Sequence, residues 1–235
     1  MQKIAFITGT GRGIGMEIAE LLLSKKYQVF GYSRTNTIKH QNFTFTKIDL
    51  SNLHEVQKIK FPKLNNRDVL LINNAARIGE IIPLNLKKTK AIINDYNLNI
   101  ISPTILCSKL ININNSNKKM IINISSGASN SSIACWSTYC ATKSALDRLT
   151  NVIAEEKHAN LTIFSVHPGV VDTQMQVEIR RANANLFPLL SKFNNYHANN
   201  ELEKPKVVAQ KLLYIIKNYS KYHQNILSIR DVNIN

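Results

Sequence analysis

Apolar stretches rich in β-branched residues alternate with stretches of helical periodicity along the chain. The apolar stretches cover residues 4–8, 28–33, 43–48, 69–73, 120–125, 161–167 and 226–229. Most of their positions are apolar, a pattern typical of strands that are covered on both faces. The segments between them have the length of crossover helices, which join parallel strands. The pattern predicts an α/β fold with a single doubly wound parallel sheet and helices on both of its faces.

The least regular part of the chain covers residues 172–204, where Pro188 and an asparagine-rich stretch interrupt the pattern. The same segment carries large apolar side chains, among them Met175, Phe187 and Phe193. We expect a mobile lid whose underside is apolar.

The length of the chain limits the number of domains. With 235 residues it is long enough for one well-buried domain and too short for two of ordinary size. We therefore expect a single domain over residues 1–235, with its substrate lid at residues 172–204.

The charge of the chain raises the question of a nucleic-acid partner. A formal net charge of +15 and a pI near 9.8 are what a nucleic-acid binder would show. However, the basic residues are scattered in small groups, without a dense stripe, interleaved aromatic residues or a nucleic-acid-binding module. We expect no nucleic-acid partner, whereas a positive field would help to capture an anionic cofactor.

Other features of the composition bear on location and metal binding. No apolar run approaches the roughly 20 residues that a membrane-spanning helix needs, and the N-terminal residues lack the segments of a signal peptide. Cys107, Cys135 and Cys140 show no CxxC spacing, which argues against a zinc site and a disulfide framework. We expect a cytoplasmic protein with reduced thiols, no membrane association and no metal.

A glycine-rich turn follows the first predicted strand. Residues 8–15 read TGTGRGIG and lead into a predicted helix over residues 16–23. Glycines permit a tight turn and a close approach of the backbone, while a helix N-terminus presents free N–H groups to a pyrophosphate. The turn therefore predicts a dinucleotide site, with six candidate contacts: Gly9, Gly11, Arg12, Gly13, Ile14 and Gly15.

A second group of residues carries side chains that suit carbonyl chemistry. Tyr139 and Lys143 lie four residues apart, on one face of a predicted helix, and Ser126 precedes Tyr139 by 13 residues. A hydride delivered to a carbonyl carbon leaves negative charge on the oxygen, so the site must donate a proton there. A nearby ammonium favours the phenolate and lowers a tyrosine pKa. We expect Tyr139 to be the acid, with its pKa lowered by Lys143.

These motifs together resemble the short-chain dehydrogenase/reductase family, over essentially the whole chain. The glycine turn resembles the family's TGxxxGxG, and Asp49, the NNAA stretch, Asn99 and HPGVVDT follow in the family's order. The resemblance implies a Rossmann-type fold in which Ser126 orients the substrate carbonyl and Lys143 bonds the nicotinamide ribose. It also implies that Asn99 supports a water-linked proton path to Lys143.

The resemblance further implies contacts with the cofactor beyond the glycine turn. Asp49 and Leu50 should contact adenine, Asn73 and Ala75 should line the cofactor cleft, and Thr173 should reach the nicotinamide end. With these, the further cofactor-binding candidates are Asn74, Pro168, Gly169, Val171, Tyr139 and Lys143.

The end of the second predicted strand indicates which dinucleotide is bound. NAD-dependent enzymes of this fold commonly carry an acidic residue there, whereas the 2′-phosphate of NADP needs positive charge. Here Ser33 takes the place of the acid, Arg34 follows it, and Arg12 lies in the glycine turn. We therefore expect NADP(H), with a solvated Arg34 as the alternative reading.

The loop PGVVDTQMQ resembles that of sepiapterin reductases and bacterial benzil reductases. Sepiapterin reductases hold the pterin with an aspartate near the C-terminus, where Ser228 stands here, which argues against a pterin substrate. We expect an NADPH-dependent reductase of a small ketone, aldehyde or diketone, mostly apolar, with Trp136 as a further wall of its pocket. The alternative is a non-enzymatic NADP-binding regulatory protein. The resemblance also implies a homodimer, or a tetramer.

Overall fold

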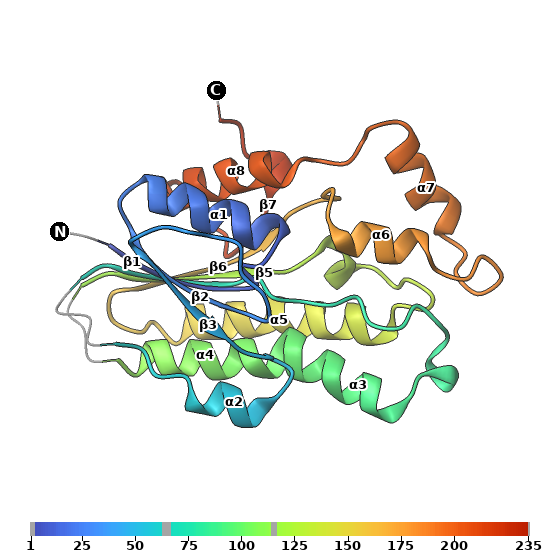
Figure 1. Cartoon of the computed structure of the whole chain (residues 1–235), viewed down its shortest axis with the longest axis horizontal. Coiled ribbons are helices and arrows are strands. Elements are labelled where there is room, and N and C mark those ends of the chain that lie inside the picture. Colours follow the sequence, from blue (N-terminus) through green and yellow to red (C-terminus); the bar gives the residue numbers. More distant parts are fainter. Residues whose placement is uncertain (1–2, 63–66, 114–116, 235) are drawn as a thin grey trace.

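Seven parallel strands form one sheet at the centre of the molecule (Figure 1). The computed structural model describes residues 3–62, 67–113 and 117–234. In it the strand order is β3-β2-β1-β4-β5-β6-β7, with every pair parallel. The strands are β1 (Ile4–Thr8), β2 (Gln28–Ser33), β3 (Phe43–Lys47), β4 (Val69–Asn73), β5 (Lys119–Ile124), β6 (Leu161–His167) and β7 (Ile226–Ser228).

Helices cover both faces of this sheet, which confirms the predicted fold class (Figure 1). The helices are α1 (Gly13–Ser24), α2 (Leu53–Lys58), α3 (Thr89–Tyr96), α4 (Ser102–Ile111), α5 (Ser137–Glu155), α6 (Gln174–Arg180), α7 (Leu190–Ala198) and α8 (Pro205–Lys217). Helices α1 and α8 lie on one face, and α2, α4 and α5 lie on the other. The chain order reverses between β1 and β4, so the carboxyl ends of these strands open a crevice.

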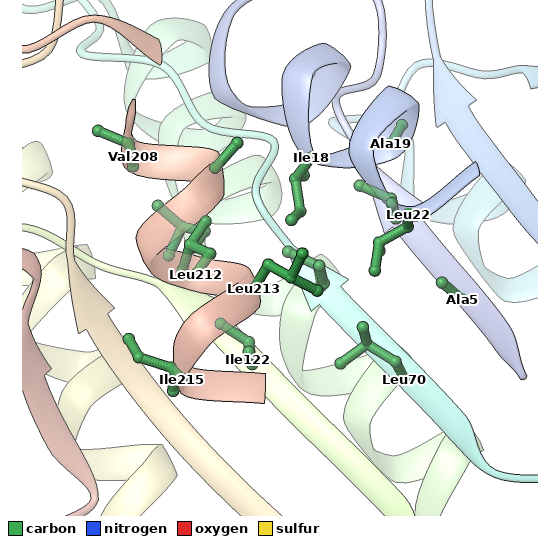
Figure 2. Close-up of a cluster of buried hydrophobic side chains, with 14 of the residues drawn as sticks. Ala5, Ile18, Ala19, Leu22, Leu70, Ile122, Val208, Leu212, Leu213 and Ile215 are labelled. Carbon is green, nitrogen blue, oxygen red and sulfur yellow. The ribbon is translucent and has the colours of Figure 1, made fainter. Parts of the chain in front are cut away.

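Side chains alternate along each strand and therefore pack into two separate cores, one on each face of the sheet. Ala5 and Ile7 of β1 face α1 and α8, whereas Ile4 and Phe6 face the opposite layer. Figure 2 shows the first core, in which Leu212 of α8 and side chains of α1 meet above the strands. Burial on both faces explains why the central strands are apolar at nearly every position.

Strand β3 departs from this rule because it lies at the edge of the sheet. Its residues are half-buried or exposed, so the prediction that this run is covered on both faces is wrong. Helix α1 also starts earlier than predicted, at Gly13 instead of Met16, because the end of the glycine turn already belongs to its first helical turn. Among the described residues no helix is long and apolar enough to cross a membrane.

The segment predicted to be irregular contains two helices, α6 and α7. Its apolar residues form a third cluster, in which Phe187 and Phe193 pack against Trp136 of α5. The ring centroids of Trp136 and Phe187 are 5.7 Å apart with nearly parallel planes, and Phe187 is only 1% exposed. The apolar underside that the sequence predicted is therefore packed onto the start of α5.

Candidate active site

A cavity of about 960 Å³ lies at the carboxyl ends of the strands and extends from the glycine turn to α6 and α7. Most of the residues predicted to bind cofactor or to act in catalysis line it. They are Gly9, Gly11, Arg12, Gly13, Ile14, Ser33, Arg34, Asp49, Leu50, Asn74, Ala75, Ser126, Tyr139, Lys143, Pro168, Gly169, Val171 and Thr173. The tertiary structure thus brings together segments from the whole length of the chain.

Two predicted contacts do not line the cavity. The side chain of Asn73 is buried and donates a hydrogen bond of 2.8 Å to Asn123 Oδ1 on β5, so the prediction that it lines the cleft is wrong. Gly15 serves packing instead, because a Cβ there would lie 2.2 Å from the carbonyl oxygen of Gly9. A glycine at this position lets α1 approach the turn closely.

The glycine turn forms a cradle for an anionic group. A Cβ at Gly11 would lie 2.6 Å from Thr35 Oγ1, so a side chain there would have to displace Thr35. Asn74 holds the turn from below, because its Nδ2 donates to the carbonyl oxygens of Thr8 and Gly9. No side chain caps the N-terminus of α1, and its first N–H groups therefore suit a phosphate. These features fit the pyrophosphate of a dinucleotide.

Positive charge gathers at the end of β2. The Ser33 hydroxyl donates a 2.6 Å bond to the Thr35 carbonyl, and the exposed Arg34 follows it. Burial favours a raised pKa for Asp49, but hydrogen bonds from Ser51 and the charges of Arg34 and Arg77 hold it below its usual value. The side chain of Arg77, which the sequence analysis did not single out, therefore lies in the same electrostatic environment as Arg34.

Arg12 lies near a carboxylate on α6. Its guanidinium lies 3.8 Å from the carboxylate of Glu178 on α6, and both side chains are largely exposed. Exposed ion pairs of this kind contribute little to the stability of a protein. Arg12 lines the cavity, but part of its charge is already compensated.

Tyr139 and Lys143 lie on α5 and face the end of β5. Lys143 is buried, and its Nζ donates a 2.7 Å hydrogen bond to the Ile124 carbonyl. The same Nζ lies 5.8 Å from the ring centroid of Tyr139. Ser126 follows β5, and its Oγ accepts a hydrogen bond from the amide of Ala128. A phenol, an ammonium and a hydroxyl thus line one cavity.

Burial controls the acid–base properties of this group. It raises the pKa of Tyr139 to about 12, against the smaller effect of a hydrogen bond with Ser126. It lowers the pKa of Lys143 to about 8, against the raising effect of the Asp147 charge. The sequence led us to expect a lowered tyrosine pKa, and the structure gives the opposite direction because desolvation disfavours the phenolate. At neutral pH the phenol is protonated and able to donate.

Asn99 lies outside the cavity wall, in a π-helical turn at Asn97–Ile101. Its Oδ1 accepts from the amide of Arg77, and its Nδ2 donates to the Arg77 carbonyl and to Thr142 Oγ1. The buried amide therefore ties the loop after β4 to α5, one residue before Lys143. A π-helical turn often marks a functional position, but neither its presence nor these partners could be read from sequence.

Other residues near the cavity were not singled out from the sequence. His167 lines the cavity, and its Nε2 lies 2.8 Å from Asp147 Oδ2. Asp147 stands four residues after Lys143, a helical spacing that could have revealed it. At the C-terminal end of the chain, Ser228 and Arg230 line the cavity, whereas Asp231 does not.

Comparisons with known proteins agree with this arrangement. Residues 3–184 match the short chain dehydrogenase family. The chain is 30% identical over 227 residues to benzil reductase ((S)-benzoin forming) of Bacillus subtilis (strain 168), covering 92% of this chain and 93% of the relative. It is 31% identical over 170 residues to sepiapterin reductase of Rattus norvegicus, covering 70% and 64%.

Solved structures share the fold. A structure of 4-hydroxyisoleucine dehydrogenase complexed with NADH superimposes with a TM-score of 0.79 at 24% sequence identity, covering 97% of this chain and 96% of the other. The match of residues 3–184 and the similarity to a reductase over 92% of the chain confirm the predicted family. The chain belongs to the short-chain dehydrogenase/reductase family of oxidoreductases.

Proposed function

We propose that the protein is an NADPH-dependent reductase of small ketones, aldehydes or diketones, with Tyr139 as the proton donor. The observation that carries this proposal is that Tyr139, Lys143 and Ser126 line the same cavity as the glycine cradle. A phenol that burial keeps protonated is the acid that carbonyl reduction requires.

The cavity has groups suited to each part of NADPH. The glycine cradle and the N-terminus of α1 would hold the pyrophosphate, and Lys143 would bond the nicotinamide ribose. Arg34 would pair with the 2′-phosphate, since Ser33 leaves the end of β2 without a carboxylate. When bound, the nicotinamide supplies the hydride.

The chain's own residues then bind the carbonyl oxygen of the substrate and supply the proton. Ser126 Oγ and the Tyr139 hydroxyl donate hydrogen bonds to the carbonyl oxygen of the substrate, and both bonds strengthen as negative charge develops. Tyr139 transfers its proton to that oxygen, while the ammonium of Lys143 stabilises the phenolate that remains. Lys143 can replace the proton, because its pKa of about 8 lies close to neutral pH.

Asn99 contributes by positioning the helix turn that carries Lys143. Because its amide holds both the backbone of Arg77 and the hydroxyl of Thr142, it fixes the helix turn that carries Lys143. The water-linked path that the family resemblance implies would start from this turn.

The substrate end of the cavity is mostly apolar. Its wall beyond Tyr139 includes Trp136, Met175 and Phe193, and the sulfur of Met175 lies 3.8 Å from the Tyr139 hydroxyl. Similarity to a benzil reductase supports an aromatic or vicinal-dicarbonyl substrate of the same kind. Reduction of benzil-like diketones is therefore the first activity to measure.

Replacement of Tyr139 by phenylalanine tests the mechanism. Tyr139→Phe should lower kcat for a reducible diketone by about 10²- to 10⁴-fold, the usual worth of general acid catalysis. Binding of NADPH, measured by fluorescence titration, should stay within about twofold, because one hydroxyl is lost and the ring is kept. Tyr96→Phe, at an exposed position of α3, is the matched control.

Two outcomes would contradict the proposal. Near-normal turnover by the Tyr139→Phe variant would exclude this residue as the proton donor. Tight NADPH binding by the wild-type protein without oxidation of NADPH, across a panel of diketones, quinones and aldehydes, would instead indicate a non-enzymatic NADP-binding regulator.

A further inference from the structure

Gln176 is a buried polar residue in the apolar part of the cavity wall. It lies in the first turn of α6, next to Met175, whose sulfur contacts the Tyr139 hydroxyl. The residue is 7% exposed, and its Oε1 has no hydrogen-bond partner in the part of the chain that the structure describes. A buried acceptor without a partner is energetically unfavourable. Such a group calls for a partner from outside the chain.

Trp136 supplies a donor in the same condition. Its indole ring lines the cavity and meets the ring of Tyr139 edge-on, with the centroids 5.5 Å apart. Phe187 and Phe193 pack on the indole, and its Nε1–H also lacks a partner among the described residues. An indole N–H can only donate, whereas an amide oxygen can only accept. Two complementary polar atoms thus lie unpaired in two residues of the cavity wall.

We propose that Gln176, assisted by Trp136, determines specificity by binding a second oxygen of the substrate, on the carbon next to the reacting carbonyl. This inference rests on the proposed carbonyl reduction. A hydroxyl there would donate to Gln176 Oε1 and accept from Trp136 Nε1. A second carbonyl would accept from Trp136 Nε1 and, after rotation of the amide, from Gln176 Nε2. The preferred substrates are therefore vicinal diketones and α-hydroxy ketones.

Three substrates with one carbon skeleton test this proposal. Next to the reacting carbonyl, benzil carries a second carbonyl, benzoin a hydroxyl and deoxybenzoin a methylene group. Gln176→Leu should lower kcat/KM for benzil and benzoin about tenfold, because it removes one buried hydrogen-bonding partner. It should leave kcat/KM for deoxybenzoin unchanged. Trp136→Phe keeps an aromatic ring and removes the N–H. It should likewise lower kcat/KM for benzil and benzoin more than for deoxybenzoin.

Gln210→Leu is the matched control, because Gln210 is exposed on α8 and does not line the cavity. It should change none of the three values. If Gln176→Leu lowers kcat/KM equally for all three substrates, the side chain supports the wall of the cavity and reads no second oxygen, and the proposal is wrong.

A binding measurement separates this proposal from the reductase activity itself. Trp136 is the only tryptophan of the chain, so intrinsic fluorescence reports on the cavity. In a Tyr139→Phe background with NADP⁺ bound, the Kd of benzoin should rise about tenfold on Gln176→Leu, while that of deoxybenzoin stays constant. If the wild-type protein reduces no carbonyl but this difference appears, the reductase proposal fails and the subsite stands. Equal Kd changes for the two ligands would overturn the subsite.

Discussion

Burial acts in opposite directions on the two ionisable side chains at the centre of the site. It keeps Tyr139 protonated far above neutral pH and brings the pKa of Lys143 down to about 8. The negative charge of Asp147, one helical turn further along α5, favours the ammonium of Lys143. The two directions together suit a site that donates a proton in the reducing direction and recovers it from solvent near neutral pH.

This balance predicts the pH dependence of the reaction. Because Lys143 must be protonated, kcat/KM for reduction should be full below pH 8 and should fall as the pH rises through about 8. Asp147→Asn removes the charge that raises the pKa of Lys143, so the fall should move to lower pH. The pH profile of initial rates provides the measurement, with Glu156→Gln at the exposed end of α5 as the control. A profile that stays flat beyond pH 9.5 would show that Lys143 does not govern the rate.

The end of β2 predicts the choice of cofactor. Arg34→Ala should weaken NADPH binding by about 10- to 100-fold and NADH binding by less than about twofold, because only NADPH carries the 2′-phosphate. Ser33→Asp should repel that phosphate and shift preference towards NADH. Dissociation constants for both cofactors measure the effect, and Lys39→Ala, another exposed cation of the same loop, is the control. Equal losses for the two cofactors would show that Arg34 is a solvated side chain.

Between elements, hydrogen bonds and an ion pair join the loop after β4 and the end of α3 to α5. The carboxylate of Asp95 is fully buried, accepts a 2.8 Å bond from Thr138 Oγ1 and lies 2.9 Å from Arg77 Nε. One turn later, Asn99 bonds Thr142. The threonines precede Tyr139 and Lys143 directly in sequence. These bonds therefore hold α5 in the rotation at which Tyr139 and Lys143 line the cavity.

Loss of the negative charge of Asp95 should destabilise the protein. Asp95→Asn weakens the pair with Arg77, and since Arg77 is partly exposed, water replaces some of the lost attraction. The free energy of unfolding in urea should fall by about 1–3 kcal/mol. Asp68→Asn removes an exposed pair with Lys3 at 3.9 Å and should cost less than about 0.5 kcal/mol. Similar losses for the two variants would show that the buried carboxylate has no special role.

For the whole molecule, the family resemblance leads us to propose a homodimer built on α4 and α5. Val152 on α5 is 48% exposed, and Ile101, just before α4, is also exposed. A symmetric interface would cover these apolar side chains. Val152→Lys should convert the dimer to a monomer in sedimentation velocity, whereas Ile234→Lys, near the C-terminus, should not. An unchanged sedimentation coefficient for Val152→Lys would place the interface elsewhere.

Much of this architecture could be predicted because strands and turns leave local signals. Apolar runs placed all seven strands to within about two residues, as expected where both faces are buried. Ser126, Tyr139 and Lys143 lie together in the cavity, as their spacing predicted, because they belong to two short segments of the chain. The predicted burial on both faces was wrong for the strand Phe43–Lys47, which has only one neighbour in the sheet. The prediction also missed α6, which has only seven residues, and α7, in which two asparagines interrupt the apolar pattern.

The sequence by itself determined the fold class, the family and the residues expected to carry the chemistry, since these depend on short-range pattern and spacing. Only the tertiary structure decided what surrounds each group. It turned Asn73 away from the cavity, used Gly15 for packing and gave Asn99 its partners on Arg77 and Thr142. It also raised the Tyr139 pKa, which the sequence had led us to expect to be lowered. Desolvation depends on all the chain segments that cover a side chain, and local spacing does not reveal them.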